Sequence, residues 1–177
     1  AKLVSFDDYL AAAEQNHQRL IVELKATPHD SKGLLARFNQ RYGARLIKDG
    51  DMVHSLDYAY VAKLHRLNPK LTVLYCMAYN FTNPAREADG VTAEYSTLNH
   101  RFIDAAHQRH QLVMAWTVNN AGAMKQALFD HADGVITDRV STLNKVIKEV
   151  RTNDTLESRT EERRVGQQCR SRWSPCH

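Results

Sequence analysis

Two apolar stretches near the carboxyl end decide the fold: residues 112–119 read Leu-Val-Met-Ala-Trp-Thr-Val-Asn, and residues 133–138 read Asp-Gly-Val-Ile-Thr-Asp. Each is an apolar run that stops abruptly at polar residues, and a segment with helical character joins them. This pattern predicts a strand, a helix and a second, parallel strand. Parallel α/β folds carry their functional groups at the carboxyl ends of such strands. The polar residues that end these runs are therefore candidates for a site.

The same alternation extends back to the start of the chain. Apolar runs predict strands over residues 20–25, 51–56, 71–78, 90–95, 112–118 and 134–137. Helical periodicity predicts helices over residues 6–15, 30–42, 58–67, 98–109, 121–130 and 141–150. Ser5 is the expected N-cap of the first helix, and Gly43 the expected C-cap of the second. The polar composition of residues 80–89 predicts a loop there. The succession predicts an α/β fold in which helices cover a parallel sheet.

Such a sheet is either an open, doubly wound sheet or a closed barrel. The sequence contains no Gly-x-Gly-x-x-Gly or P-loop segment that would favour a nucleotide-binding open sheet. A complete (β/α)8 barrel needs eight units and about 250 residues, whereas this chain has 177 residues. The barrel interpretation therefore requires that the front units are missing.

Composition and charge exclude several function classes. Hydrophobic residues make up 43% of the chain and charged residues 25%, as in an ordinary globular domain. We expect a soluble chain, because no apolar run reaches the roughly 20 residues of a membrane helix and no signal peptide is recognisable. The net charge is +4. The chain has no basic stripe interleaved with aromatic residues, so we expect no nucleic-acid partner.

The chain divides into a domain over residues 1–150 and a tail over residues 151–177. The tail has six arginines and four acidic residues, so it supplies +2 of the +4 charge. It lacks apolar periodicity, and we expect it to be disordered and foreign to the domain, or at best a frayed extension of the last helix. Cys169 and Cys176 lie in the tail, which leaves Cys76 alone in an apolar strand, where a buried small hydrophobe is expected.

Glu23 and Lys25 interrupt the first predicted strand. Alternate residues of a strand point to the same side, so both share a face with Ile21, while Val22 and Leu24 face the other way. In a barrel, the face with the charges would be the interior, where unpaired charges are costly. A metal ion on Glu23 and a phosphate on Lys25 would satisfy them. A structural ion pair at the strand end explains the same pattern.

Other residues at strand exits also have two interpretations. Trp116 lies near the carboxyl end of its predicted strand, and Asn119 follows at the exit. The Trp116 side chain could form the wall of a ligand pocket, or it could be an ordinary core residue. Asp57 and Asp138 are site residues or N-caps of the helices that follow, and Ser55 lies beside the first of them.

The nine histidines give no metal motif. His107 and His110 lie three positions apart on a polar helix, but no acidic residue stands between or beside them. His29 and Asp30 could form an acid/base pair, although capping of a helix by Asp30 is simpler. His54 is expected to be a surface or satisfied core residue.

Four segments together resemble the glycerophosphodiester phosphodiesterase family in order and spacing. They are Glu23-Leu24-Lys25, Ser55-Leu56-Asp57, Trp116-Thr117-Val118-Asn119 and residues 133–138. The resemblance covers about residues 3–145. Ser55-Leu56-Asp57-Tyr58 is most similar to the branch whose catalytic domain is fused to a multi-helix membrane domain.

The resemblance implies a (β/α)8 barrel that hydrolyses glycerophosphodiesters to an alcohol and glycerol 3-phosphate with a divalent cation, Mg²⁺ or Ca²⁺. By matching motifs, Glu23 would be a metal ligand, Lys25 would contact the phosphate, and Trp116 would wall the pocket around the glycerol end.

The family's motifs that precede the Glu-Leu-Lys strand find no match here. These include a His-Arg-Gly strand, a Glu-x-Asp segment and a His-Asp pair, which hold two metal ligands and both catalytic histidines. We therefore expect a carboxy-terminal fragment, strands three to eight of the barrel, without catalytic residues of its own and inactive alone. The parent protein is expected to be membrane-associated. A lysophospholipid phosphodiesterase and a non-catalytic phosphate-binding or regulatory module remain alternatives.

Overall fold

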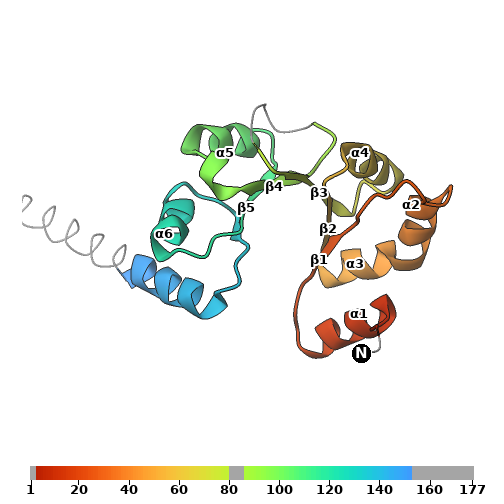
Figure 1. The fold of residues 1–177 in the computed structure, drawn as a ribbon, viewed down its shortest axis with the longest axis horizontal. Coiled ribbons are helices and arrows are strands. Elements are labelled where there is room, and N and C mark those ends of the chain that lie inside the picture. The colour runs from red at the N-terminus through yellow and green to blue at the C-terminus, as the bar shows by residue number, and fades with distance from the viewer. Residues whose placement is uncertain (1–2, 80–85, 153–177) are drawn as a thin grey trace, which may run out of the picture.

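A computed structural model of the chain describes residues 3–79 and 86–152. Six parallel strands form one sheet, and their order in the sheet is their order in the chain. They are β1 (Ile21–Glu23), β2 (Met52–Ser55), β3 (Thr72–Met77), β4 (Gly90–Glu94), β5 (Leu112–Trp116) and β6 (Gly134–Val135). A doubly wound sheet reverses its strand order partway, and this sheet does not. The sheet curls into part of a barrel (Figure 1), which confirms the predicted α/β class.

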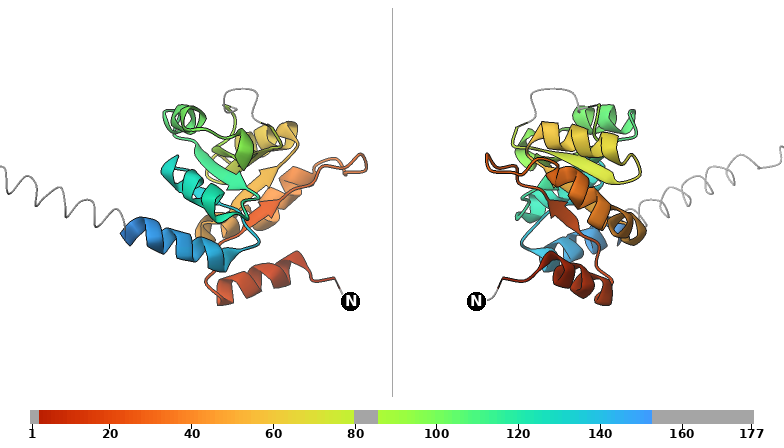
Figure 2. Two further views of the ribbon diagram at one scale, coloured as in Figure 1. Left: turned by 60° about the vertical axis from the view of Figure 1, so that its left-hand side comes forward. Right: turned by 90° about the vertical axis from the view of Figure 1, so that its right-hand side faces the viewer.

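The helices lie on the outer side of the curl, and its concave side carries no helix of the described residues (Figures 1 and 2). They are α1 (Phe6–Gln15), α2 (Leu34–Phe38), α3 (Ala44–Asp49), α4 (Tyr58–Leu67), α5 (His100–His107) and α6 (Ala121–Phe129). A further helix covers residues 140–152, blue in Figure 1. Residues 80–85 of the predicted loop and residues 153–177 of the predicted tail lie outside the described residues.

Helix ends follow local hydrogen bonding. The Ser5 hydroxyl accepts from the Asp8 N–H at 3.1 Å, which confirms Ser5 as the N-cap of α1. The prediction of one helix over residues 30–42 ending at Gly43 was wrong. The helical segment begins at Leu34, passes through a π-helical turn at Asn39–Gly43 and ends at Asp49. Gly50, with φ +73°, takes the left-handed position that closes it.

The core lies between the sheet and its outer helices, in three apolar clusters. Val53 and Val73 pack there against α1, α3 and α4, and Val91 and Val113 pack against α5. The same packing takes the alternate residues Val22 and Leu24 toward the helices. Ile21 and Glu23 therefore point to the concave side, as the alternation predicted.

Candidate active site

A cavity of about 510 Å³ opens at the carboxyl ends of β1 and β2. It is lined by residues 23–26 and 55–57, so the structure brings Glu23, Lys25, Ser55 and Asp57 together. These residues come from two segments that are distant in the sequence but neighbours in the sheet. The cavity lies at the end of the sheet where parallel α/β folds place their sites.

Hydrogen bonds fix the two walls of this cavity to each other. The Leu24 N–H donates to the His54 carbonyl at 2.8 Å, which extends the pairing of β1 with β2. The buried Ser55 hydroxyl donates to the Leu24 carbonyl at 2.5 Å and accepts from the Asp57 N–H at 3.2 Å. Ser55 thus holds the geometry of the strand exits.

Asp57 acts as a helix cap. Its carboxylate accepts from the Tyr60 N–H at 3.1 Å at the start of α4. The capping interpretation of Asp57 is therefore confirmed, although the residue also lines the cavity.

Glu23 and Lys25 form an open pair. Lys25 Nζ lies 3.8 Å from Glu23 Oε2, and 74% of the lysine side chain and 37% of the glutamate side chain are exposed. An exposed ion pair of this kind contributes only about 0–1 kcal/mol to stability. The pair therefore does little to hold the fold, and both charged groups are accessible to an anion or a cation in the cavity.

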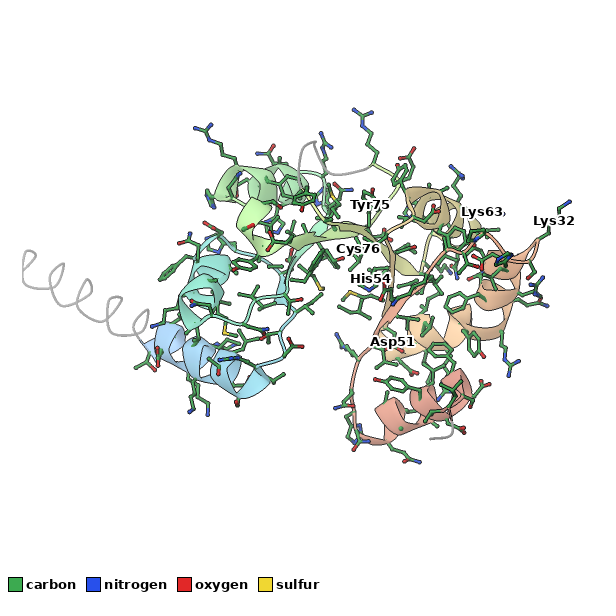
Figure 3. All side chains as sticks on the ribbon, viewed as in Figure 1. Lys32, Asp51, His54, Lys63, Tyr75 and Cys76 are labelled. Atoms are coloured by element: carbon green, nitrogen blue, oxygen red, sulfur yellow. The ribbon has the colours of Figure 1, made fainter. Side chains whose placement is uncertain are left out.

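A polar group continues across the concave side of the sheet. His54 on β2, the strand partner of Glu23, places Nδ1 3.1 Å from the hydroxyl of Thr92 on β4. Burial lowers the pKa of His54, and the nearby charge of Glu23 partly opposes this shift. His54 and Cys76 lie on the side of the sheet away from α4 and α5 (Figure 3). The alternation around Val53 could have placed His54 on this face from the sequence alone.

Cys76 on β3 is buried, as predicted for a small hydrophobe. Burial raises the pKa of its thiol, while hydrogen bonding to Thr92 acts in the opposite direction. Trp116 is half-buried, and it lies on β5, with three strands between it and β1. It contributes nothing to the lining of the cavity beside Glu23 and Lys25, so the structure does not bring these three predicted residues together.

The exits of β5 and β6 are joined by side chains. The Asn119 carbonyl oxygen accepts from the Thr137 hydroxyl at 2.9 Å and from the Asp138 N–H at 3.0 Å. The Asn119 amide donates to the Asp138 carboxylate at 2.9 Å. The Arg139 N–H, near the start of the last helix, donates to the Thr137 hydroxyl at 2.9 Å. Asn119 and Asp138 therefore connect the two strand ends.

The loop after β1 is organised by Asp30. Its carboxylate accepts from the Thr27 N–H at 2.8 Å, the Thr27 hydroxyl at 2.6 Å and the Tyr60 hydroxyl. These hydrogen bonds, with the Thr27 hydroxyl first, lower the pKa of Asp30. The bond to Asp30 raises the pKa of Tyr60 to about 12. The predicted helix-capping role of Asp30 was wrong, because Gly33 occupies the N-cap position of α2.

Within residues 3–79 and 86–152, no three His, Cys, Asp or Glu side chains are placed to hold a metal ion together. The described residues therefore offer a cation one carboxylate in the cavity, Glu23, beside the helix-capping Asp57. They do not form a complete cation site by themselves.

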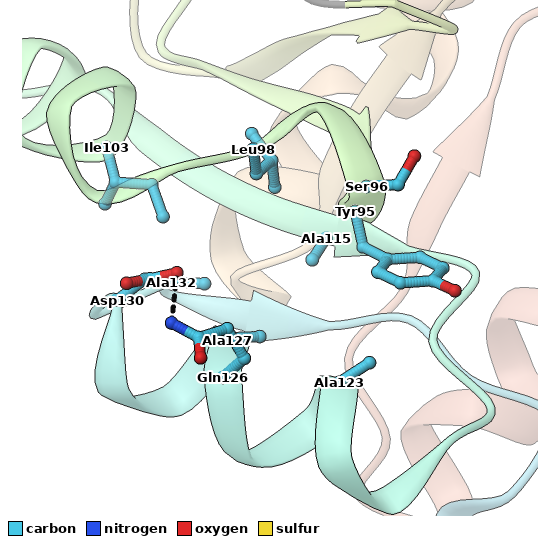
Figure 4. A pocket seen from close by; sticks show the side chains of 10 residues that line it. All are labelled: Tyr95, Ser96, Leu98, Ile103, Ala115, Ala123, Gln126, Ala127, Asp130 and Ala132. Atoms are coloured by element: carbon cyan, nitrogen blue, oxygen red, sulfur yellow. Dashed lines mark hydrogen bonds between the residues drawn. The ribbon is translucent and has the colours of Figure 1, made fainter.

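A second cavity, of about 260 Å³, lies on the helix side of the sheet, between α5 and α6 (Figure 4). Four of its lining residues are alanines, whose small side chains do not fill the space: Ala115, Ala123, Ala127 and Ala132. Its one carboxylate, Asp130, accepts from the Gln126 amide at 3.0 Å. This cavity offers no cationic side chain to a phosphate and is a packing gap between two helices.

None of the helices in the described ranges combines the length and the apolar character of a bilayer-spanning segment.

The curled parallel sheet and the cavity at its strand ends define an α/β protein of the barrel class. A model described as the glycerophosphoryl diester phosphodiesterase family matches residues 9–142, well over half of the chain. The chain belongs to this family. No curated protein matches it.

Several solved structures are similar. A glycerophosphodiester phosphodiesterase from Parabacteroides distasonis has 20% identity and a TM-score of 0.67, over 81% of this chain and 64% of its own. A phosphodiesterase from Oleispira antarctica, in complex with the product sn-glycerol-3-phosphate, has 15% identity and a TM-score of 0.60, over 78% of this chain and 59% of its own. A glycerophosphodiester phosphodiesterase from Agrobacterium tumefaciens has 14% identity and a TM-score of 0.59, over 80% of this chain and 60% of its own. The present chain thus spans about three fifths of the length of these proteins, and the likeness shows a shared fold.

Proposed function

We propose that this chain supplies strands three to eight of a (β/α)8 barrel that hydrolyses glycerophosphodiesters to an alcohol and glycerol 3-phosphate. The observation that carries the proposal is the cavity that places Glu23 and Lys25 side by side at the strand carboxyl ends, within the family match. A similar structure is a phosphodiesterase in complex with sn-glycerol-3-phosphate, which supports the same class of small-molecule substrate here.

In this proposal, Lys25 binds the phosphate. Its ammonium group is a compact point charge on a flexible stem, and its exposure lets it approach a substrate oxygen. Glu23 is one ligand of a divalent cation, Mg²⁺ or Ca²⁺, since carboxylate oxygens suit hard cations. Such a cation supplies charge neutralisation at the phosphate. Trp116 lies on the same concave side of the sheet but outside the lining of this cavity, and in this proposal it walls the more distant, glycerol end of the substrate.

The chain alone is inactive in this proposal. The described residues place one carboxylate rather than a set of three groups at a cation, and the family's two acid/base histidines have no counterparts by motif. General acid and base groups each contribute about 10²–10⁴-fold to rate. We expect no turnover of glycerophosphocholine above background with about 10 mM Mg²⁺ or Ca²⁺, a concentration that nearly saturates a millimolar site. Clear metal-dependent turnover would contradict the fragment proposal.

A non-catalytic phosphate-binding module is the second candidate. The 74% exposure of Lys25 and its distance of 3.8 Å from Glu23 favour it, because a lysine can bind an anion without a cation. Calorimetric titration with glycerol 3-phosphate separates the two. If the chain is part of the enzyme, the cation should increase its affinity for glycerol 3-phosphate. If the chain is a non-catalytic module, the cation should leave that affinity unchanged. A lysophospholipid phosphodiesterase is separated by its substrate, lysophosphatidylcholine, in the assembled barrel.

Both candidates expect Lys25→Ala to weaken glycerol 3-phosphate binding, by about tenfold for a lost charge-assisted contact of 1.4 kcal/mol. The matched control is Lys63→Ala, which removes an exposed lysine on α4 (Figure 3) that is not among the residues lining the cavity. Equal affinities for the two variants would contradict the assignment of Lys25.

A further inference from the structure

A third cavity, of about 520 Å³, lies at the opposite end of the sheet, where β3, β4 and β5 begin. Its lining is rich in cationic and potentially cationic side chains: Arg86, Arg109, His65 and His110, with Asp89 as the one carboxylate. We infer that this cavity is a second anion site, which binds a small molecule bearing a phosphate or pyrophosphate group, independently of the site at Glu23 and Lys25.

The carboxylate of Asp89 is committed within the fold. Its Oδ2 atom accepts from the Val73 N–H at 2.8 Å and lies 3.3 Å from His65 Nδ1. Its backbone also joins the two neighbouring strands, because the Asp89 N–H donates to the Val73 carbonyl and the Leu112 N–H donates to the Asp89 carbonyl. Asp89 therefore builds the floor of the cavity, and its charge is already shared with His65.

The carboxylate of the neighbouring Glu87 is hydrogen-bonded to a residue outside the cavity lining. Its carboxylate accepts from the hydroxyl of Tyr58, and that bond, with the charges of Arg66 and Arg86 as lesser causes, lowers the pKa of Glu87. Glu87 lies outside the lining of the cavity, so it reduces the field of Arg86 without occupying the space that an anion would take.

The two arginines stand on segments that are fixed against each other. Gln111 is buried, and its side-chain amide donates to the Ala88 carbonyl at 2.8 Å, which connects the turn before β5 to the segment before β4. That turn is tight, with His110 at φ +59° and its N–H donating to the His107 carbonyl at 2.8 Å. Arg86 and Arg109 are both exposed side chains on this preformed frame.

This combination selects an anion of particular chemistry. Planar guanidinium groups recognise phosphate oxygens through paired hydrogen bonds, and histidine N–H groups add further donors. A concave cavity of this volume fits a small ligand rather than a flat macromolecular surface. Because the cavity lies at the amino ends of the strands, a ligand there would be remote from the proposed catalytic end.

The test is residue-resolved NMR of the full chain titrated with inorganic pyrophosphate at low salt. We expect saturable shifts at the backbone amides of Asp89, His110 and Gln111. In the double variant Arg86→Gln/Arg109→Gln the dissociation constant at these amides should rise at least about tenfold. Arg86→Lys/Arg109→Lys keeps the charge but loses the planar fork, and should give a smaller rise.

The matched control is Arg101→Gln/Arg139→Gln, which removes the same charge from exposed positions elsewhere. It should leave the dissociation constant within about twofold. Three results would overturn the proposal: no saturable shift at the three amides, equal weakening in the control, or binding only to phosphatidic acid vesicles and not to pyrophosphate. Lys25→Ala should leave these shifts unchanged, so failure here is distinct from failure of the proposed function.

Discussion

Leu24 lies between Glu23 and Lys25, two charged residues whose exposed ion pair stabilises the fold by too little to explain their presence. Leu24 packs toward the helices, and Glu23 and Lys25 point to the concave side. In this curled but unclosed sheet, both charges reach solvent and their desolvation penalty is small. In a closed barrel they would need compensating partners. A cation and a phosphate are such partners, which is why these two positions carry the functional assignment.

Acid should remove the stabilising contribution of Asp30. Its folded pKa lies below the ordinary value of 3.8, so its hydrogen bonds to Thr27 and Tyr60 stabilise the fold above that pH. The contribution is lost as pH falls through the lower, folded pKa. Asp30→Asn should therefore be less stable than the parent chain at pH 7, and the difference should shrink at pH 3. Urea unfolding at both pH values measures this, and an equal difference at both would contradict the account.

Gly90 should not tolerate a side chain. A Cβ atom there would lie 2.8 Å from both the Cβ and the N atom of Leu112 on the neighbouring strand. We expect Gly90→Ala to destabilise the chain by about 1–3 kcal/mol through overpacking. The control is Gly122→Ala on α6, where the nearest atom is the tip of the Asn120 side chain at 3.1 Å. Its effect should stay below about 1 kcal/mol, and equal thermal unfolding shifts would contradict the close-approach argument.

At the scale of elements, some boundaries could be predicted and others could not. Helices α1 and α4 have the predicted bounds because Ser5 and Asp57 make local capping bonds that the sequence displays. The end at Gly43 was mispredicted because a helix-ending glycine and a close-packed one look alike in sequence. Gly43 is buried against Asn39 and Asn68, whose side chains hydrogen-bond at 2.7 Å, and this contact depends on tertiary packing.

Filling the gap between α5 and α6 should stabilise the chain. Ala123 lines the 260 Å³ cavity shown in Figure 4. Ala123→Leu should therefore raise the free energy of unfolding by about 0.5–2 kcal/mol. Ala121→Leu, on the exposed side of the same helix, is the matched control and should change it by less than about 0.5 kcal/mol. Denaturant unfolding compares the two, and destabilisation by Ala123→Leu would contradict the packing-gap interpretation.

For the whole molecule, the βα succession predicted the parallel sheet, because each predicted strand alternates with a helix. The succession alone left a doubly wound sheet and a barrel both open, and the chain order of a barrel was implied only by the resemblance of the four motifs. The pairing of Glu23 with Lys25 also followed from alternation within one strand. The sequence could not show that Trp116 lies outside their cavity, since this depends on how far the sheet curls between β1 and β5. It also gave no sign of the Arg86–Arg109 cavity, whose two sides are joined by the tertiary bond from Gln111 to Ala88.

The two outer strands should promote association. Among the described strands, β1 pairs with β2 alone and β6 with β5 alone, so each leaves an edge. Unprotected edges pair with other chains. We expect concentration-dependent oligomers in sedimentation at micromolar concentration. Ile21→Lys, on the edge strand, should shift the chain toward monomer, whereas Ile47→Lys, of similar exposure on α3, should not. A stable monomer of the parent chain with a sharp unfolding transition would contradict this expectation.

The most direct measurement for the central claim is a crystal structure of the full chain with sn-glycerol 3-phosphate and Ca²⁺. The account predicts the phosphate in the cavity between residues 23–26 and 55–57, with an oxygen within hydrogen-bond distance of Lys25 Nζ. Phosphate bound elsewhere on the chain while this cavity stays free of it, or no bound phosphate at saturating concentration, would contradict the assignment of Glu23 and Lys25.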